Sequence, residues 1–158
     1  MDLSNLPDSS RVWIYQSHRE LTPNEVSQIE VVLSGFTSSW KAHGQLLQAS
    51  SAILYNRFLV LSVNEQHAAA SGCSIDDSVR VLKEVGEKFG VDLFNRMLVC
   101  YMHEENVVCD PMHDFWAKRK GGVVTDETLV FDTTVQSLGA LKQNFLVTFK
   151  KSWHSEMW

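Results

Sequence analysis

One segment near the start of the chain constrains the fold more than any other. In Thr22-Pro23-Asn24-Glu25, the threonine hydroxyl can accept a hydrogen bond from the Glu25 amide while the Glu25 carboxylate reaches back, and proline suits the first helical position. The pattern predicts a helix from about residue 22 to residue 40 that must bury one face. That face is formed by apolar residues at steps of three and four: Val26, Ile29, Leu33, Phe36 and Trp40.

The segments on either side of this helix have strand character. Residues 11–17 (RVWIYQS) place bulky side chains on both faces of an alternating pattern. Two further β-like runs cover residues 46–55 and 58–63, and the polar Asn56-Arg57 joins them. The second run, FLVLSV, is apolar enough for a central strand, so we expect a sheet on which the helix packs.

A second helix is predicted from about residue 75 to residue 89. Ser74 is the expected cap, Asp77 stands at the box position, and Gly90 supplies the stop. After this helix, the pattern predicts a hairpin with strands at residues 96–102 and 106–109 and a turn at residues 103–106. A short helix capped by Asp110-Pro111, a strand at 129–131, a helix at 137–144 and a strand at 145–149 are expected to follow.

This order of elements predicts an α+β fold. The first six elements, β-α-β-β-α-β, fit a ferredoxin-like α/β sandwich, with further strands and short helices at the carboxyl end and an open sheet order after residue 96. The length of 158 residues suits a single domain spanning residues 1–158. Residues 1–10 are expected to be a flexible leader, whereas the aromatic tail at 152–158 either docks or stays mobile.

Charge and cysteine content restrict the setting of the protein. The formal net charge of −5 gives no general attraction to nucleic acid, and no segment has the length and apolar character of a signal peptide or a membrane span. Three cysteines form an odd, sparse set that does not resemble the framework of a secreted mini-protein. We therefore predict a cytoplasmic protein with reduced thiols that binds neither membrane nor nucleic acid.

The motifs of the familiar enzyme classes are missing from the sequence. It contains no G-x-x-x-x-G-K-[ST] loop, so an ATPase of the P-loop type is not expected. It also lacks G-x-G-x-x-G, G-x-S-x-G, H-E-x-x-H and C-x-x-C. No cofactor is predicted.

The most distinctive local segment is the small-residue loop at residues 70–76, which leads into the second helix. Free amides at a helix start attract anions and lower the pKa of a thiol, which makes Cys73 and Asp76 the candidate catalytic residues. The candidate ligand-binding residues are Arg57, which would hold an anionic group, and Ser71, Gly72 and Ser74. His67 would share their rim. The alternative is a capped helix with an inert thiol, because acidic residues in its first turn would oppose both effects.

Two other groups of residues are candidate sites. The spacing C-x2-H-x5-C-x3-H suggests zinc, but in a hairpin Cys100 and His103 point to opposite faces, so no metal site is predicted. Several aromatic and polar side chains can line a pocket, although core packing is the expected role of Trp40. The members of this second group are Trp13, Tyr15, Trp40, Tyr55, Trp153 and His154.

Several strings resemble those of a small bacterial family of about this length that commonly carries the label "ABC transporter ATPase". They are RVWIYQS, YNRFLVLSV, SGCSIDDSV, FGVDLFNR, LVFDTTVQ and KKSWH, and they extend over nearly the whole chain. The resemblance implies a cytoplasmic bacterial protein with no established activity. The transporter label is not supported by the motifs, since the chain has no Walker A sequence.

Two functions remain open from the sequence. The first and favoured one is a non-catalytic binding or regulatory module that acts on a protein partner or a small molecule and that can form a homodimer. The second is a small enzyme or anionic-ligand-binding protein that uses the 71–76 loop with Arg57. The second hypothesis predicts that Arg57, Cys73 and Asp76 converge in one cleft.

Overall fold

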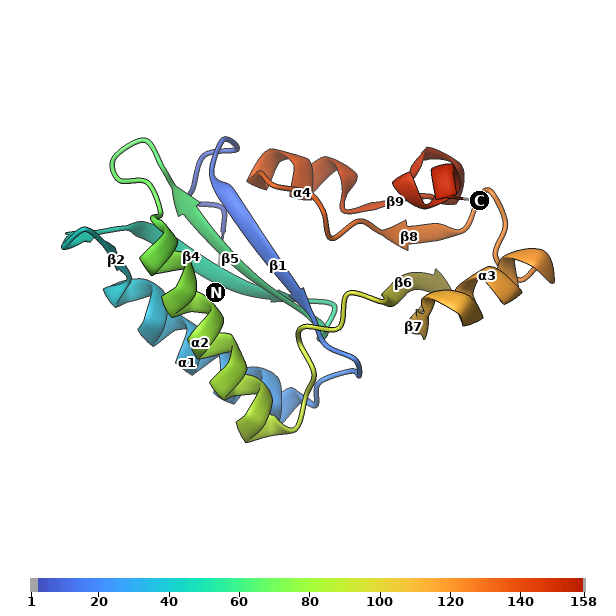
Figure 1. Ribbon diagram of the computed structural model, residues 1–158, viewed down its shortest axis with the longest axis horizontal. Helices are drawn as coiled ribbons and strands as arrows, with labels where there is room; N and C mark the ends of the chain where they lie inside the picture. Colours follow the sequence, from blue (N-terminus) through green and yellow to red (C-terminus); the bar gives the residue numbers. More distant parts are fainter. Residues whose placement is uncertain (1–2, 158) are drawn as a thin grey trace.

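A three-stranded antiparallel sheet backed by two helices forms the first part of the molecule. In the computed structural model, which describes residues 3–157, the strands are β1 (Arg11–Gln16), β4 (Gln48–Leu54) and β5 (Phe58–Asn64), in the order β1-β5-β4. The helices α1 (Pro23–Ser39) and α2 (Gly72–Phe89) lie together on one face (Figure 1). We call this part the helix-backed sheet. A two-stranded ribbon, β2 (Lys41–Ala42) and β3 (Gln45–Leu46), follows α1.

The central strand β5 explains why the helix-backed sheet has two covered faces. All of its 7 residues are buried. Leu59, Leu61 and Val63 belong to the core cluster under the helices, which includes Ile29 of α1 and Leu82 of α2. Phe58 and Val60, which alternate with them, belong to a second cluster on the other face.

The second cluster joins the helix-backed sheet to a second sheet, which we call the carboxy-terminal sheet. Its strands are β6 (Leu98–His103), β7 (Asn106–Pro111), β8 (Leu129–Phe131) and β9 (Leu146–Thr148), in the order β7-β6-β8-β9. Helices α3 (Met112–Lys120) and α4 (Leu138–Asn144) and two short 3-10 helices, η1 (Phe149–Lys151) and η2 (Trp153–Met157), accompany it. Figure 1 shows the two sheets on either side of the molecule. The α+β class predicted from the sequence is confirmed.

The last strand of the expected sandwich core has a different partner. A ferredoxin-like sheet would place β6 beside β1, but β6 pairs with β7 on one side and with β8 on the other. Both edges of β6 are thereby used. The outer edge of β1 instead meets residues 136–138: Arg11 bridges Ser137, and the Val12 amide donates to the Gln136 carbonyl at 3.0 Å. Beyond this contact, the outer edge of β1 runs beside a cleft.

The two main helices begin at side-chain caps, one as predicted and one earlier. The capping box of α1 is formed by Thr22 and Glu25, which confirms the sequence prediction. Helix α2 begins at Gly72 after Ser71, and not at Ser74. The Ser74 amide donates to the Ser71 hydroxyl and the Ser71 amide to the Ser74 hydroxyl, so two serines make a box that the usual Glu or Gln pattern does not reveal.

The first and last described segments are packed against the rest of the molecule. Of the predicted flexible leader, residues 1 and 2 lie outside the described residues, while Leu6 is buried in the second cluster. The aromatic tail docks, since His154 is 2% exposed and contacts Phe115 of α3; Trp158 lies outside the described residues. No helix within residues 3–157 has the length and apolar character needed to cross a membrane.

The three cysteines do not all remain reduced, contrary to the sequence prediction. Cys100 of β6 and Cys109 of β7 stand directly opposite one another and form a disulfide, with 4.1 Å between their Cα atoms. The hairpin register, set by the turn at Glu104-Glu105, brings the two sulfur atoms together. Only Cys73 is a free thiol among the described residues.

Asp110 has a different role from the predicted helix cap. Helix α3 begins after Pro111 with no side-chain cap. The Asp110 carboxylate accepts hydrogen bonds from Lys118, at 2.8 Å, and from the hydroxyl of Tyr101. These contacts fasten α3 to the β6–β7 hairpin.

Candidate functional site

A cleft lies along the open edge of β1, between the helix-backed sheet and the carboxy-terminal sheet. Its volume is about 540 Å³. The Arg11–Ser137 bridge marks one end of the open edge, and at the other end Gln16 Nε2 donates to the Leu98 carbonyl at 2.9 Å. We call this space the β1 cleft. It exists because β6 turns to its own sheet and leaves the edge of β1 uncovered.

Aromatic side chains from both sheets form much of the cleft wall. Trp13 and Tyr15 project from the helix side of β1 and Phe94 follows α2, while Phe131 comes from β8 and Trp153 from η2. Tyr15 and Phe94 meet edge to face at 5.5 Å between ring centroids. Such a wall favours a flat apolar molecule.

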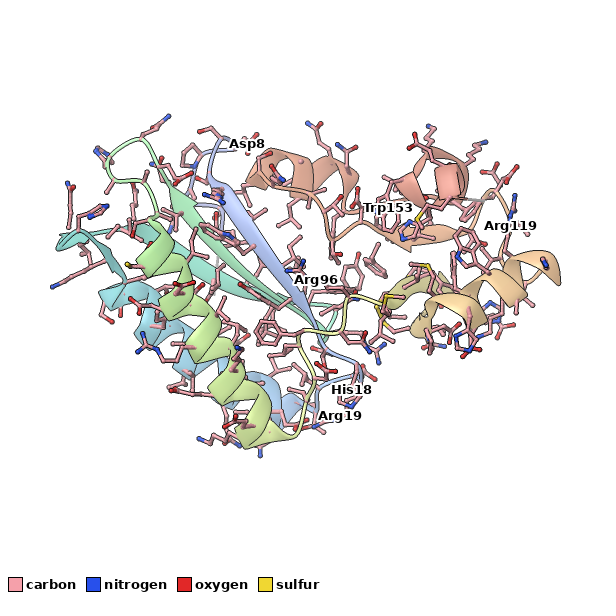
Figure 2. All side chains as sticks on the ribbon, in the orientation of Figure 1. Asp8, His18, Arg19, Arg96, Arg119 and Trp153 are labelled. Carbon is pink, nitrogen blue, oxygen red and sulfur yellow. A yellow bond between two sulfur atoms is a disulfide. The ribbon has the colours of Figure 1, made fainter. Side chains whose placement is uncertain are left out.

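One cation, Arg96, stands among these aromatic residues. It lies on the connection between α2 and β6, beside β1 (Figure 2). Within residues 3–157 its guanidinium has no hydrogen bond and no ion pair with another side chain. Burial raises the pKa of Tyr15, while a hydrogen bond with Ser78 and the positive charge of Arg96 act in the opposite direction. Arg96 is therefore close enough to β1 to act on groups inside the cleft.

The far wall of the cleft contains two stacked rings whose polar atoms are covered. Trp153 and His154 stack at 3.9 Å between centroids, with an angle of 25° between their planes. Trp153 Nε1 and His154 Nδ1 are buried without a hydrogen-bond partner among the described residues. Burial lowers the pKa of His154 to about 4, with a smaller opposing effect of Asp132. His154 is thus a neutral imidazole at pH 7.

The disulfide also contributes to the wall of the cleft. Cys100 lines the cleft and is 1% exposed. Its Sγ lies 3.3 Å from Oε1 of Gln16. A disulfide sulfur carries no proton, so this contact becomes a hydrogen bond only when the bond is reduced to thiols. Because both cysteines are bonded to one another, they cannot act as thiolate ligands of zinc in this state.

The predicted helix-start residues do not enter the β1 cleft. Ser71 and Ser74 use their hydroxyl groups on one another's backbone, and Gly72 is the first helical residue. Cys73 and Asp76 are exposed on the surface of α2. The serines therefore form a helix cap, which is the structural alternative to a ligand-binding loop.

Arg57 lies far from this helix start. It immediately precedes β5, whereas Ser71 follows the opposite end of that strand, and a strand of 7 residues is roughly 20 Å long. His67 is exposed in the loop after β5. The structure therefore does not bring Arg57, Cys73 and Asp76 into one cleft. Burial lowers the pKa of Arg57, and the charge of Glu20 opposes this effect.

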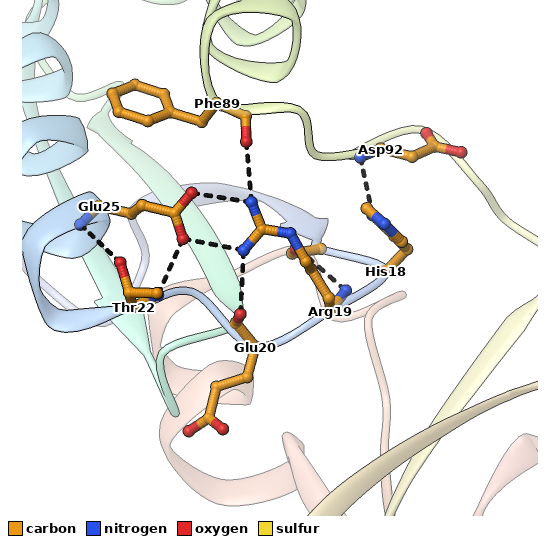
Figure 3. A network of polar contacts seen from close by, with 8 residues as sticks. His18, Arg19, Glu20, Thr22, Glu25, Phe89 and Asp92 are labelled. Carbon is orange, nitrogen blue, oxygen red and sulfur yellow. Dashed lines mark hydrogen bonds and ion pairs between the residues drawn. The ribbon is translucent and has the colours of Figure 1, made fainter.

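A network of polar contacts at the other end of α2 has a structural role. Arg19 donates to both carboxylate oxygens of Glu25 at 2.8 Å and to the Phe89 carbonyl at 2.8 Å, and His18 accepts from the Asp92 amide (Figure 3). The hydrogen bonds from Arg19 lower the pKa of Glu25 to about 2. The network ties the start of α1 to the end of α2.

Comparisons with protein-family models, curated proteins and solved structures found no match to this chain. The resemblance to a bacterial family therefore stays a prediction. Most of the strings on which it rests contribute side chains to the β1 cleft: RVWIYQS, SGCSIDDSV, FGVDLFNR, LVFDTTVQ and KKSWH.

Sequence reasoning found part of this cleft and missed its cation. Of the aromatic residues considered as pocket-lining, Trp13, Tyr15, Trp153 and His154 line it, whereas Trp40 is 2% exposed and belongs to the core, as predicted. Arg96 was not singled out. Its only sequence signal is its place at the end of the string FGVDLFNR.

Proposed function

We propose that this chain is a non-catalytic binding module whose ligand occupies the β1 cleft. The ligand class is a small molecule with a flat apolar body and one anionic group. A single observation carries the proposal: the aromatic wall of a 540 Å³ cleft holds one cation, Arg96, that has no ion-pair partner within residues 3–157. Guanidinium groups bind carboxylate, sulfonate and phosphate oxygens through paired hydrogen bonds.

The polar residues near Arg96 support an anchoring role and not a catalytic one. Asn95, Thr133 and Thr134 line the same cleft and can hydrogen-bond a polar ligand. Cys73, the free thiol, is not among the lining residues. Catalysis of this kind would need a nucleophile beside a base, but His154, the only histidine of the wall among the described residues, is stacked on Trp153 and lies beside Phe115.

Two related dyes test the proposal directly. Anilinonaphthalene sulfonate has a flat aromatic body and an anionic group, and N-phenylnaphthylamine has nearly the same body without the charge. Both are expected to bind the folded protein and to quench its tryptophan fluorescence, because Trp13 and Trp153 line the cleft. Arg96→Gln should weaken binding of the sulfonate about tenfold and leave the neutral dye within about twofold.

The control variants separate the cleft from the rest of the surface. Arg80→Gln removes an arginine of α2 that pairs with Asp77 on the exposed surface, so it should change neither affinity. Thr133→Trp should block the cleft and weaken both dyes. Circular dichroism must first show that each variant is folded, since the sulfonate also binds loosely packed states. Equal affinity of the sulfonate for wild type and Arg96→Gln would contradict the proposal.

In a binding module of this kind, ligand binding would change the interaction with a partner. We propose a protein partner or a second copy of the chain, in the cytoplasm, as the sequence predicts. Sedimentation of the protein with and without the sulfonate dye tests for the second copy. The thiol state of Cys100 and Cys109 in cells tests the compartment, because a reducing cytoplasm would hold them as thiols.

A further inference from the structure

A second pocket lies between two hairpin turns, at the end of the helix-backed sheet opposite the start of α2. One turn joins β4 to β5 and the other joins β6 to β7. The pocket has a volume of about 260 Å³ and shares no lining residue with the β1 cleft. Its lining residues are Glu20, Tyr55, Asn56, Arg57, Glu105, Asn106 and Val107. We call it the Arg57 pocket.

Arg57 is the unusual feature of this pocket. Its side chain belongs to a residue that is only 9% exposed, yet within residues 3–157 the guanidinium makes no hydrogen bond and no ion pair. Its backbone is fully engaged, since the Arg57 amide donates to Leu54 and its carbonyl accepts from Ser17. The guanidinium nitrogens are not among the fully covered polar atoms that lack a partner, so solvent reaches them through the pocket, but a cation so largely removed from water is costly for a protein to maintain. An oxyanion in the pocket would replace that solvent with a charged acceptor.

The rim of the pocket carries the opposite charge. Glu20 acts on Arg57 through its negative charge without hydrogen-bonding it, and Glu105 lies at the tip of the other turn. Figure 3 shows the Glu20 carboxylate directed away from the Arg19 network, so it is not used there. A plain anion would be attracted by Arg57 and repelled by both glutamates. A molecule that carries an anion and a cation on neighbouring atoms would satisfy both charges.

The backbone around the pocket is held in an uncommon conformation. Tyr55 and Asn56 have φ values of 55° and 53°, and Glu104 and Glu105 have φ values of 51° and 69°. Non-glycine residues seldom adopt this left-handed region, and bulky ones such as tyrosine least of all. Tyr55 is held by ring contacts with Phe131 at 5.0 Å and Phe58 at 6.3 Å. The two turns therefore keep Arg57 and Glu105 in a fixed arrangement.

We propose that the Arg57 pocket binds a small zwitterion, namely a free α-amino acid with a small side chain. Its carboxylate lies on the Arg57 guanidinium and its ammonium group faces Glu20 and Glu105. The side-chain amides of Asn56 and Asn106 provide further hydrogen bonds at the rim. The size of the pocket favours alanine or serine over aromatic amino acids.

Calorimetric titration with L-alanine and three analogues tests this site. Alaninamide lacks the carboxylate, N-acetylalanine lacks the ammonium group, and acetate is a plain anion. L-alanine is expected to bind, and each analogue should bind at least about tenfold more weakly because one charged contact is lost. Acetate that binds as tightly as alanine would overturn the proposal in favour of a simple anion site.

Variants of the pocket complete the test. Arg57→Gln should reduce alanine affinity about tenfold or more, and Arg57→Lys should restore part of it if the glutamine variant folds poorly. Glu20→Gln should weaken alanine and strengthen acetate. Arg80→Gln and Arg96→Gln lie outside this pocket and should leave alanine binding unchanged, which separates this site from the β1 cleft. If no amino acid binds, the proposal is wrong, and a non-additive effect of Arg57→Gln and Glu20→Gln on stability would then show that the two residues form a structural charge pair.

Discussion

The helix-backed sheet and the carboxy-terminal sheet are stabilised by different means. In the helix-backed sheet, β5 pairs with β4 along its whole length and with β1 over residues 58–63, and each main helix has a side-chain cap. In the carboxy-terminal sheet, β8 and β9 have 3 residues each, and β6 meets β8 at a single pair, Tyr101 with Val130. Aromatic packing and a disulfide stabilise the carboxy-terminal sheet. Continuous strand pairing and helix caps stabilise one part, whereas aromatic packing and a cross-strand disulfide stabilise the other.

The largest expected effect tests whether the two parts fold as one unit. Phe58 is fully buried at the start of β5, with ring centroids 4.7 Å from Phe131 and 5.0 Å from Phe145. Phe58→Ala should lower the free energy of unfolding by about 3–5 kcal/mol, through lost burial and a cavity. Guanidinium unfolding followed by far-UV circular dichroism and by tryptophan fluorescence measures the change.

Both signals should shift together, because Phe58 belongs to the cluster that joins the sheets. Val31→Ala, at a side chain of α1 that is 73% exposed, serves as the control and should cost less than about 0.5 kcal/mol. A shift in one signal alone would mean that the two sheets unfold separately.

The second prediction concerns pH and the carboxy-terminal part. His154 has a folded pKa of about 4, below its usual value, because it is buried. The unfolded chain therefore binds the proton first as pH falls, and the stabilisation that is complete above about pH 6.5 is lost progressively down to pH 4, by at most about 3 kcal/mol. Unfolding midpoints at pH 7 and pH 5 measure the loss.

The comparison with His154→Phe isolates this effect from other titrating groups. Phenylalanine keeps a ring against Phe115 and Trp153 but cannot be protonated. The variant should lose less stability than the wild type between pH 7 and pH 5. An identical loss in both proteins would show that His154 is not the responsible group.

The third prediction concerns the disulfide of the carboxy-terminal sheet. Replacing Cys100 and Cys109 by alanine should reduce stability by about 2 kcal/mol, because the bond closes only a short loop of the unfolded chain. In this variant, hydrogen exchange should show a greater loss of protection in β6 and β7 than in β5. Cys73→Ser, at an exposed free thiol, is the matched control and should have no effect. Equal loss of protection in β5 would contradict a local role.

The features that were predicted from the sequence are those with local signals. The capping box of α1, the apolar run of β5 and the turn at residues 103–106 are local signals, and each of them appears in the structure. The start of α2 was placed too late because Ser71 and Ser74 form a box from two serines. The disulfide was missed although the predicted hairpin, turning at 103–106, already placed Cys100 opposite Cys109.

The sites depend on long-range contacts and were therefore harder to predict. The β1 cleft brings Trp13, Arg96 and Trp153 together from segments far apart in the chain. No local spacing relates these positions. The prediction that Arg57 holds an anionic group stays a prediction, but the structure does not bring Arg57 and Cys73 into one cleft, because β5 separates them.

The smallest expected effect returns to the helix-backed sheet. Thr22→Ala removes the hydroxyl that accepts from the Glu25 amide at 3.1 Å, which should cost about 1 kcal/mol. The loss is limited because Arg19 still holds Glu25 through two hydrogen bonds. Thermal unfolding measures it, with Ser38→Ala as the control, since that hydroxyl donates only to a carbonyl one turn back in the exposed part of α1. A cost well above that of the disulfide would mean that the caps, and not the long central strand, determine the stability of the helix-backed sheet.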